Sequence, residues 1–173
     1  MKRLNGALVC VSATLLFASP ASARAPITTQ ATLLDRVQIE DMMTEYYALL
    51  TRHERHDIGE YFAEEAVLDA NGAIFEGRAA IQKLYDNSTD IRVGDGSIYN
   101  MLIGNPRITV DGDKAVMDAV WTGFLSDNIY TAPRLVEQGT EHTTFERRDG
   151  VWLITSRKLV NQGGTPLWLT GEN

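Results

Sequence analysis

The sequence contains few of the residues from which disulfides and metal sites are built. Its 173 residues include one cysteine and three histidines. Cys10 lies in an apolar stretch at the start of the chain, so the rest of the protein has neither a disulfide nor a thiol nucleophile. The histidines, His53, His56 and His142, lack the spacing of metal ligands. We therefore expect no metal site.

Positive charge and long hydrophobic runs are also scarce. The 16 lysines and arginines are outnumbered by 23 aspartates and glutamates, which gives a formal net charge of −7. This acidity opposes binding to nucleic acid and to anionic lipid surfaces. The longest apolar run, Ala7–Phe17, is shorter than a transmembrane helix requires. We therefore expect a mature protein that binds neither nucleic acid nor membrane.

Residues 1–23 have the order of features of a bacterial export signal. Two basic residues form a charged start, Ala7–Phe17 is the apolar part, and Ala21-Ser22-Ala23 supplies the small residues that a signal peptidase recognises. We expect cleavage after Ala23 and a periplasmic or secreted protein, with an uncleaved membrane anchor as the alternative. Residues 24–32 would then form a short flexible segment before the folded domain.

The first part of the domain is predicted to be helical. From Leu33, apolar residues recur at spacings of three and four, which is typical of an amphipathic helix. The members of this stripe are Ile39, Met42, Met43, Tyr46, Leu50 and His53. Two short helices are expected after it, one near Asp57 and one over Gly77–Tyr85. Between them, Asn71-Gly72 predicts a hairpin of Val67–Asp69 with Ala73–Glu76.

The second part alternates apolar and polar residues, as strands do. Turn residues predict two hairpins, Ile98–Val110 with Lys114–Leu125 and Leu135–Arg148 with Val151–Leu159. One face of the strand that begins at Lys114 consists of Ala115, Met117, Ala119 and Trp121. The fold is thus predicted to be α+β, with one domain over residues 33–160. In the tail, residues 161–173, we expect the apolar segment Pro166-Leu167-Trp168-Leu169 to act as a lid or to contact a partner subunit.

Five segments carry a resemblance to a known family: Ile39–Met42 with Tyr46-Tyr47, Phe62–Val67, Gly77–Ile81, Asn105–Asp113 and Arg148–Trp152. Together they resemble the nuclear transport factor 2-like superfamily, and within it the SnoaL-like group of polyketide cyclases and dehydratases. The resemblance implies a cone, in which a curled antiparallel sheet wraps the long N-terminal helix around a hydrophobic cavity. It also implies a cofactor-free protein, often a homodimer, that holds a small hydrophobic or aromatic molecule.

The same resemblance implies proton-transfer chemistry, which depends on a His–Asp pair in several members. The Asp position falls on Thr51 and the His position on Met101, and a shift of one residue would give Asn100. None of these side chains can act as a base. The usual pair is therefore missing, and Thr51 and Met101 are expected only to line the cavity.

Two other residues are candidates for the base. His53 continues the helical stripe, and a histidine ordinarily titrates near neutral pH. Alternatively, Arg52–Asp57 is a solvated helix end. Glu141 alternates with inward-facing apolar positions, and burial would suit its carboxylate to acid–base chemistry. A register shift of one residue would turn His142 inward instead.

The remaining candidates would polarise or bind the substrate. Tyr46 is the better match to the family's catalytic tyrosine, with Tyr47 beside it, although a core tyrosine would look the same. Asn100 is a possible donor to an oxyanion. Arg157 would either anchor an anionic group or pair with Glu141. The cavity wall is expected to include Met101, Met117 and Trp121.

These observations predict an exported, cofactor-independent lyase or isomerase. It would act on a small hydrophobic, aromatic molecule by dehydration, retro-aldol cleavage or proton transfer. One alternative is a periplasmic module that binds such a molecule without chemistry, and another is an interaction protein that works through its sheet face. A meeting of His53, Glu141 and Tyr46 in one cavity would favour the enzyme.

Overall fold

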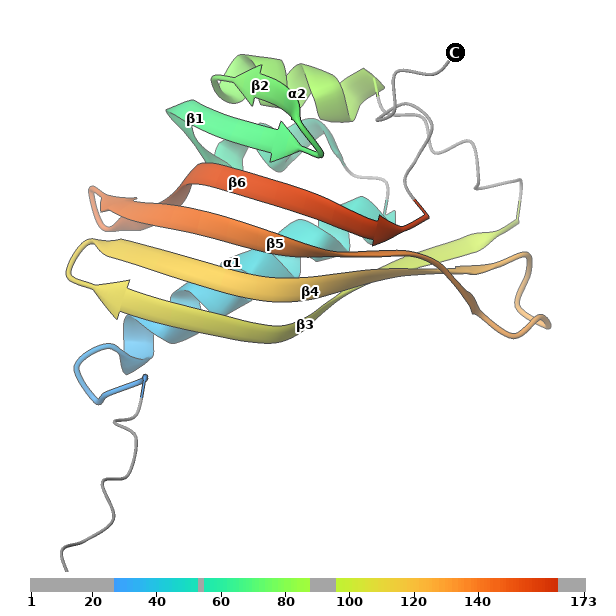
Figure 1. Cartoon of the computed structure of the whole chain (residues 1–173), viewed down its shortest axis with the longest axis horizontal. Helices are drawn as coiled ribbons and strands as arrows, with labels where there is room; N and C mark the ends of the chain where they lie inside the picture. Colours follow the sequence, from blue (N-terminus) through green and yellow to red (C-terminus); the bar gives the residue numbers. More distant parts are fainter. Residues whose placement is uncertain (1–26, 53–54, 88–95, 165–173) are drawn as a thin grey trace, which may run out of the picture.

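The chain forms a six-stranded sheet with a long helix across one face (Figure 1). The computed structural model describes residues 27–52, 55–87 and 96–164, and the backbone alone of residues 51, 52, 55 and 56. The helical elements are α1 (Leu33–Arg52), the 3-10 helix η1 (Arg55–Tyr61) and α2 (Arg78–Asn87). The strands are β1 (Phe62–Ala70), β2 (Ala73–Glu76), β3 (Ile98–Asp111), β4 (Lys114–Ser126), β5 (Arg134–Arg148) and β6 (Val151–Gly163). The predicted α+β class is confirmed.

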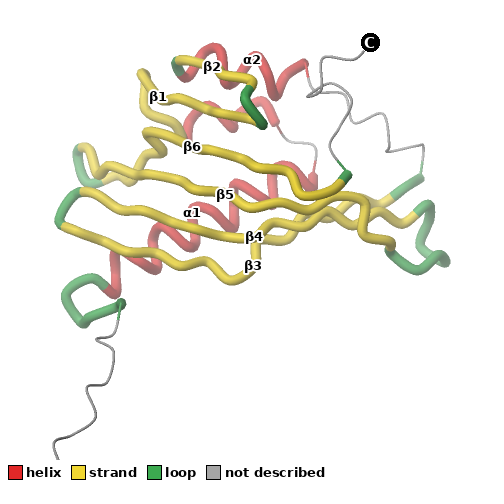
Figure 2. Tube along the Cα trace, in the orientation of Figure 1, coloured by secondary structure: helices red, strands yellow, loops and turns green. Residues whose placement is uncertain are grey.

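The strand order is β2-β1-β6-β5-β4-β3, and β3 to β6 form an antiparallel meander (Figure 2). β1 pairs in parallel with β6 and antiparallel with β2. At the β1–β2 turn, Asn71 and Gly72 have φ angles of 55° and 90°; at the β5–β6 turn, Asp149 and Gly150 have 52° and 83°. Both pairs adopt the left-handed backbone that a two-residue hairpin turn needs, which confirms the hairpins expected there.

α1 runs obliquely across the meander (Figure 1). We call the sheet face against α1 the inner face and the opposite one the outer face. Strand alternation divides the residues of β4 cleanly, because every second side chain points to the same side. Those predicted to share a face are all buried: Ala115, Met117, Ala119 and Trp121. They join a core that includes Ile39, Met43, Tyr46, Phe62, Ile108, Phe145 and Ile154.

The sheet curls because its long strands contain irregularities. The β3–β4 register shifts between Gly104 and Arg107, where Asn105 has a φ of 51°. The β5–β6 register shifts between Thr144 and Phe145. Such bulges bend a strand and increase its twist. The curled meander therefore wraps around α1 rather than lying flat on it.

One end of α1 is fixed to two turns of the sheet by Arg147. This guanidinium contacts Asp35 of α1 at 2.5 Å and Asp113 of the β3–β4 turn at 2.8 Å. Its Cζ atom also lies 5.2 Å from the centre of the Trp152 ring, a cation–π arrangement. The start of α1 is thereby held between the β3–β4 and β5–β6 hairpins.

Two boundaries differ from the sequence-based expectation. β1 begins at Phe62 rather than near Val67, and β6 continues to Gly163, so that part of the expected tail belongs to the sheet. The leader, residues 1–23, and the segment Pro166–Leu169 lie outside the described residues. Within the described ranges, no helix has both the length and the apolar character needed to cross a bilayer.

Candidate active site

A buried ion pair lies on the inner face between β5 and β6. Nε and Nη2 of Arg157 donate to Oε2 of Glu141 at 2.7 and 2.6 Å. Arg157 is 2% exposed and Glu141 is 3% exposed. The prediction that Glu141 points inward is therefore confirmed. Arg157 was expected either to anchor an anionic group or to pair with Glu141, and the structure shows the pair with Glu141.

Two consecutive tyrosines of α1 enclose the same guanidinium. Nη2 of Arg157 donates to the hydroxyl oxygen of Tyr47 at 2.7 Å. Its Cζ atom lies 4.4 Å from the ring centre of Tyr46 and 5.4 Å from that of Tyr47. Successive helical residues point in directions about 100° apart, so one ring supplies a π face and the other a hydroxyl. The helix and the sheet are thus joined through one arginine.

Burial and neighbouring charges together determine the protonation states of Tyr46, Tyr47 and Arg157. It raises the pKa of both Tyr46 and Tyr47 well above 10, although the positive charge of Arg157 opposes the shift. Burial alone would lower the pKa of Arg157, but Glu141 and the tyrosines outweigh it and leave that pKa raised. At neutral pH both phenols therefore keep their protons, and the arginine keeps its charge. The Tyr47 oxygen accepts from Arg157, and a hydrogen bond with the Glu141 side chain also helps to raise the Tyr47 pKa.

Tyr46 is the centre of an aromatic cluster. Its ring meets those of Tyr47, Tyr61, Phe62 and Tyr85 edge-on at centroid distances of 5.7 to 6.3 Å. Its hydroxyl is 2.5 Å from that of Tyr85 in α2. The hydroxyl of Tyr46 is therefore engaged with α2, whereas that of Tyr47 lies beside the Glu141–Arg157 pair. Tyr47 is the better placed of the two to act with Glu141.

Five buried polar atoms have no hydrogen-bond partner among the described residues. Three of them lie at neighbouring inner-face positions of β4 and β5, namely Oε1 of Glu141, Nε1 of Trp121 and Oγ1 of Thr143, and the other two are Nε1 of Trp152 and Nδ2 of Asn161. A buried polar atom without a partner costs about 1–3 kcal/mol, so native proteins satisfy such atoms with water or a ligand. A carboxylate acceptor, an indole donor and a hydroxyl that can do both thus lie in the same region, which is where a polar ligand would find hydrogen-bond partners.

The indole ring of Trp121, which is a residue of β4, lies over the neighbouring strand β5 between two inward-facing acids. A Cβ atom on Gly139 would come within 2.5 Å of Cζ2 and 2.7 Å of Cε2 of the indole ring. The ring therefore covers Gly139, and the residues on either side of it on this face of β5 are Glu137 and Glu141. The space for a flat aromatic wall exists because this position of β5 lacks a side chain.

Glu137 is a buried acid that the sequence analysis did not single out. It is 6% exposed and accepts a hydrogen bond from the hydroxyl of Tyr99 on β3. A signal for it was present, because Glu137 and Glu141 are four residues apart on one strand and must share a face. Tyr85 was also missed, and its position on a separate helix gives no comparable signal.

Two expected site residues face the wrong way. Asn100 is exposed and pairs with Phe124 on the outer face, since its neighbours Tyr99 and Met101 point inward. His142 is exposed on the outer face, where its Nδ1 lies 2.8 Å from Oδ1 of Asp118. The proposed oxyanion role of Asn100 and the cavity position of His142 are therefore wrong. In both cases the alternation of side chains along the strand turns the residue to the outer face.

The remaining expected residues divide into two groups. Met117 and Trp121 are buried on the inner face, and the half-buried Met101 packs against the same core. His53 lies outside the described residues, and so does the side chain of Thr51. Tyr46 and Glu141 both contact Arg157, and the expected meeting of these two residues with His53 in one cavity stays a prediction. The internal cavity itself stays a prediction.

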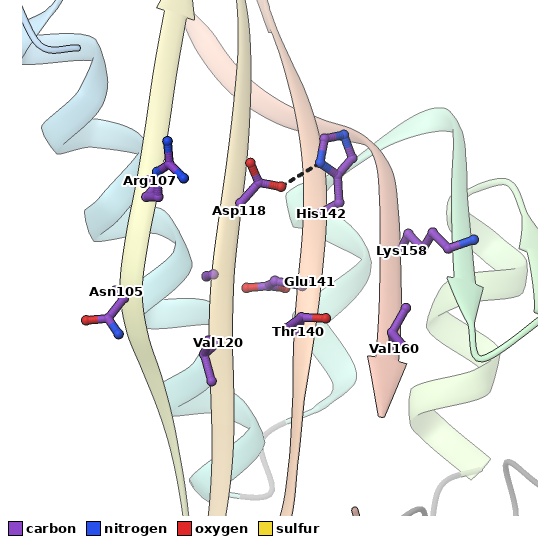
Figure 3. Close-up of a pocket in the computed structure, with 10 residues that line it drawn as sticks. Asn105, Arg107, Asp118, Val120, Thr140, Glu141, His142, Lys158 and Val160 are labelled. Atoms are coloured by element: carbon purple, nitrogen blue, oxygen red, sulfur yellow. Dashed lines mark hydrogen bonds and ion pairs between the residues drawn. The ribbon is translucent and has the colours of Figure 1, made fainter. Parts of the chain in front are cut away.

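The outer face contains a hollow of about 390 Å³ (Figure 3). Its wall includes the Asp118–His142 pair together with Arg107 and Lys158, and Val120 and Val160 add apolar surface. Figure 3 shows these side chains in front of the strands, with the helices behind. The hollow is thus open on the outer face, and although Glu141 is among the residues that line it, the Glu141 carboxylate is buried against Arg157.

The described part of the chain contains no group of three or more histidine, cysteine or acidic side chains placed to hold a metal ion. The inner cluster is suited to a different chemistry. Oε1 of Glu141, which has no hydrogen-bond partner among the described residues, can accept a proton from carbon or oxygen. A protonated tyrosine beside it can donate a hydrogen bond to a developing oxyanion.

The sequence matches a known domain family over most of the described region. Residues 31–158 match the SnoaL-like domain. Among curated proteins no relative matches the sequence.

Three solved structures illustrate the structural likeness. An NTF2-like protein with a cystatin-like fold from Novosphingobium aromaticivorans has a TM-score of 0.65 and 24% identity, over 78% of this chain and 86% of its own. A proposed scytalone dehydratase from the same organism has a TM-score of 0.62 and 19% identity, over 78% and 89%. ActVI-ORFA of Streptomyces coelicolor has 0.63 and 14%, over 73% and 96%. At these identities the likeness shows the fold alone.

Proposed function

The chain belongs to the SnoaL-like family, and from this premise we propose that it is a cofactor-independent lyase or isomerase acting on a small aromatic molecule. The observation that carries the proposal is the state of the Glu141 carboxylate. Arg157 holds one of its oxygens, and the other is buried with no partner among the described residues. A desolvated, fixed carboxylate oxygen of this kind is suited to general base catalysis.

Each group of the cluster then has a part in the reaction. Oε1 of Glu141 takes a proton from the carbon next to a substrate carbonyl. The hydroxyl of Tyr47 donates to the carbonyl oxygen as negative charge develops there, and its own oxygen accepts from Arg157, which polarises the O–H bond. Arg157 acts as a positioning residue, because it fixes the carboxylate and the phenol relative to each other.

The charges of the inner face favour an uncharged substrate. The buried charged residues among those described are Arg157, Glu137 and Glu141. Arg157 is already paired with Glu141, so this guanidinium is not available to hold an anionic substrate. A carboxylate or phosphate would gain little from this face, whereas a neutral ketone or phenol would meet apolar walls and a few polar atoms.

A second candidate function is a module that binds the same molecule without chemistry. The observation in its favour is the replacement of the family's usual pair by Thr51 and Met101, with Met101 packed into the core. A site without a working base would keep the aromatic wall and lose turnover. The two functions therefore predict the same ligand and differ only in reaction.

Proton exchange separates the two functions. With 2-acetylnaphthalene in D₂O, we expect the enzyme to catalyse exchange of the acetyl protons above the buffer rate, followed by NMR. Exchange should fall in Glu141→Gln, persist in the outer-face control His142→Gln, and be unchanged by EDTA. Tight binding of the ketone without exchange would contradict the lyase or isomerase and support the binding module.

We also propose that the protein is exported and forms a homodimer through its outer face. Leu102, Leu135 and Val160 are exposed on this face, around the hollow that contains Val120. A second copy would cover them. Light scattering should give a dimer, and Leu102→Asp should give a monomer with unchanged circular dichroism. A monomeric wild type at micromolar concentration would contradict the dimer.

A further inference from the structure

Five ionisable side chains form one row across the outer face of the sheet. The strand registers pair Arg107 with Asp118, Asp118 with His142, His142 with Lys158, and Lys158 with Asp69. The row therefore has one member on each of β3, β4, β5, β6 and β1, in the order of these strands in the sheet. Directly paired residues of neighbouring strands share a face, so all five lie on the outer face, and four of them line the hollow of Figure 3.

The middle of this row is accessible to a partner molecule. The side chains of Asp118, His142 and Lys158 are 61%, 55% and 59% exposed. Within one chain, Asp118 contacts His142, and Lys158 contacts Asp69 at 3.0 Å. Arg107 is exposed and has no ion pair among the described residues. The row thus presents a fixed pattern of charge to whatever covers this face.

The pattern of charge is complementary to its own reversal. From β3 to β1 it is positive, negative, histidine, positive and negative, and in the opposite direction it is negative, positive, histidine, negative and positive. A two-fold axis parallel to β5 and above His142 would reverse the row. It would place Arg107 opposite the partner's Asp69, Asp118 opposite the partner's Lys158, and His142 opposite the partner's His142. An axis along the row would instead place each charge against its own copy, which is unfavourable.

The next row of the outer face fits the same axis. The strand registers place Val120, Thr140 and Val160 side by side on β4, β5 and β6. The axis above β5 would bring Val120 opposite the partner's Val160, so apolar surface would meet apolar surface. Two sheets that pack face to face in this aligned way lie about 10 Å apart, within reach of their side chains. Both rows are therefore self-complementary, as a two-fold interface requires.

We propose that a second copy of this chain packs on the outer face about the axis above His142, and that protonation of His142 weakens this dimer. The assignment rests on the homodimer proposed above. It adds the position of the axis, the residues that meet across it and a dependence on pH.

The dependence on pH follows from the groups around His142. Histidine is the member of the row that ordinarily changes charge between about pH 5 and 8. The charged groups that face it are Asp118 from β4 and Lys158 from β6, and its outer-face neighbours along β5 are Thr140 and Thr144. In a single copy, Asp118 stabilises the protonated imidazole. In the dimer, Asp118 also faces the partner's Lys158 and the imidazole faces a second imidazolium, so the dimer weakens as pH falls.

Charge reversal tests the contacts across the axis. Asp118→Lys would place a lysine against the partner's Lys158, and Lys158→Asp would place an aspartate against the partner's Asp118. We expect each variant to raise the dimer Kd at least about tenfold at pH 8 and low salt, measured by analytical ultracentrifugation. An equimolar mixture of the two variants restores opposite charges at both contacts and should dimerise like the wild type. Asp41→Lys, an equal change of charge on the exposed side of α1, is the control and should leave Kd unchanged.

Cross-linking tests the position of the axis. Cys10 is the only cysteine of the sequence, so Cys10→Ser provides a background without thiols. In this background His142→Cys places a single thiol at the axis, next to the same thiol of the second copy, and a short bismaleimide should join the two chains. Arg107→Cys is the control, because it lies two strands from the axis and about 20 Å to the side of its own copy. It should not be joined.

The pH arm uses the wild type and His142→Gln. Between pH 8 and pH 5 the Kd of the wild type should rise at least about tenfold, whereas His142→Gln should remain dimeric with little change. A wild-type Kd that is constant over this range would overturn the role of His142. Thermal melts identify the variants that fold, so that loss of the dimer is not confused with unfolding.

Other results would overturn the axis itself. They are unchanged Kd in the folded reversal variants, a mixture that does not recover, or cross-linking of Arg107→Cys but not of His142→Cys. A dimeric wild type with any of these results would keep the homodimer and remove this axis, whereas a monomeric wild type would contradict both. Proton exchange from 2-acetylnaphthalene is a separate measurement, so the proposed reaction stands or falls independently.

Discussion

Arg157 and Glu141 form an ion pair whose side chains are 2% and 0% exposed, with Nη2 and Oε2 2.6 Å apart. Such a pair differs from a surface salt bridge because neither charge can return to water if its partner is removed. The pair is also the junction of helix and sheet, since Arg157 contacts Tyr46 and Tyr47 of α1. Its loss should therefore affect both stability and the candidate site.

We expect Arg157→Met and Glu141→Gln each to lower the free energy of unfolding by about 3–5 kcal/mol, because each leaves one partner of a buried pair uncompensated. The double variant Glu141→Leu/Arg157→Met should be more stable than either single one. Urea unfolding measures all three. As a control, Arg134→Met breaks an exposed pair with Asp127 and should change stability by about 1 kcal/mol or less. Additive losses in the double variant would contradict this coupling.

Tyr47→Phe should reduce proton exchange from 2-acetylnaphthalene by about 100-fold, since one oxyanion donor is removed while the ring remains. Its effect on the Kd of the ketone should be much smaller. Tyr130→Phe is the matched control, because Tyr130 is 90% exposed on the β4–β5 turn. NMR exchange rates and calorimetry give the two quantities. Equal rates in the wild type and Tyr47→Phe would remove Tyr47 from the reaction.

Acid should weaken one surface contact over a defined pH range. The hydrogen bond from Arg148 lowers the pKa of Glu65 from 4.5 to about 2. A lowered carboxyl pKa stabilises the fold above the unfolded value, and the contribution is lost as pH falls to the folded value. The stability difference between the wild type and Glu65→Gln should thus be full above pH 4.5 and disappear towards pH 2.

Urea midpoints between pH 2 and pH 6 test this expectation for Glu65. Because the Glu65 carboxyl is exposed, the difference should shrink at high salt. A difference that stays constant across the pH range would show that the carboxyl charge does not contribute.

Export should produce a mature protein that begins at Arg24, because the charged start, the apolar run and Ala21-Ser22-Ala23 follow one another in order. N-terminal sequencing of the periplasmic fraction of a Gram-negative host checks this. Ala23→Phe, which blocks the recognised small residue, should accumulate the uncleaved form. A cytoplasmic protein that still begins at Met1 would contradict export.

The local parts of the fold could be predicted because local chemistry decides them. Asn71-Gly72 and Asp149-Gly150 specify their turns by their need for positive φ, and alternation places Trp121 and Glu141 on one face. Alternation also decides against Asn100, once Met101 is seen to point inward. The prediction for Asn100 was wrong because it shifted the register by one residue to place a hydrogen-bond donor in the cavity.

The site could be predicted only in part, since its contacts join distant segments. Glu141 and Arg157 are on neighbouring strands, so their pairing was a reasonable guess. The contact of Arg157 with Tyr47 depends on how α1 crosses the sheet, which no local pattern states. The contact of Tyr99 with Glu137 depends on the absence of a side chain at Gly123, which lies on the strand between theirs.

The parallel pairing of β1 with β6 has a consequence for the order in which the chain folds. Val67–Ala70 find their partners in Ser156–Leu159, near the far end of the domain, whereas β3 to β6 are joined by short turns. Closing so long a loop costs chain entropy before any contact compensates it. During synthesis or passage through a translocon, β1 and β2 have no sheet to join until β6 has emerged. The sheet can therefore be completed only after its last strand has been released.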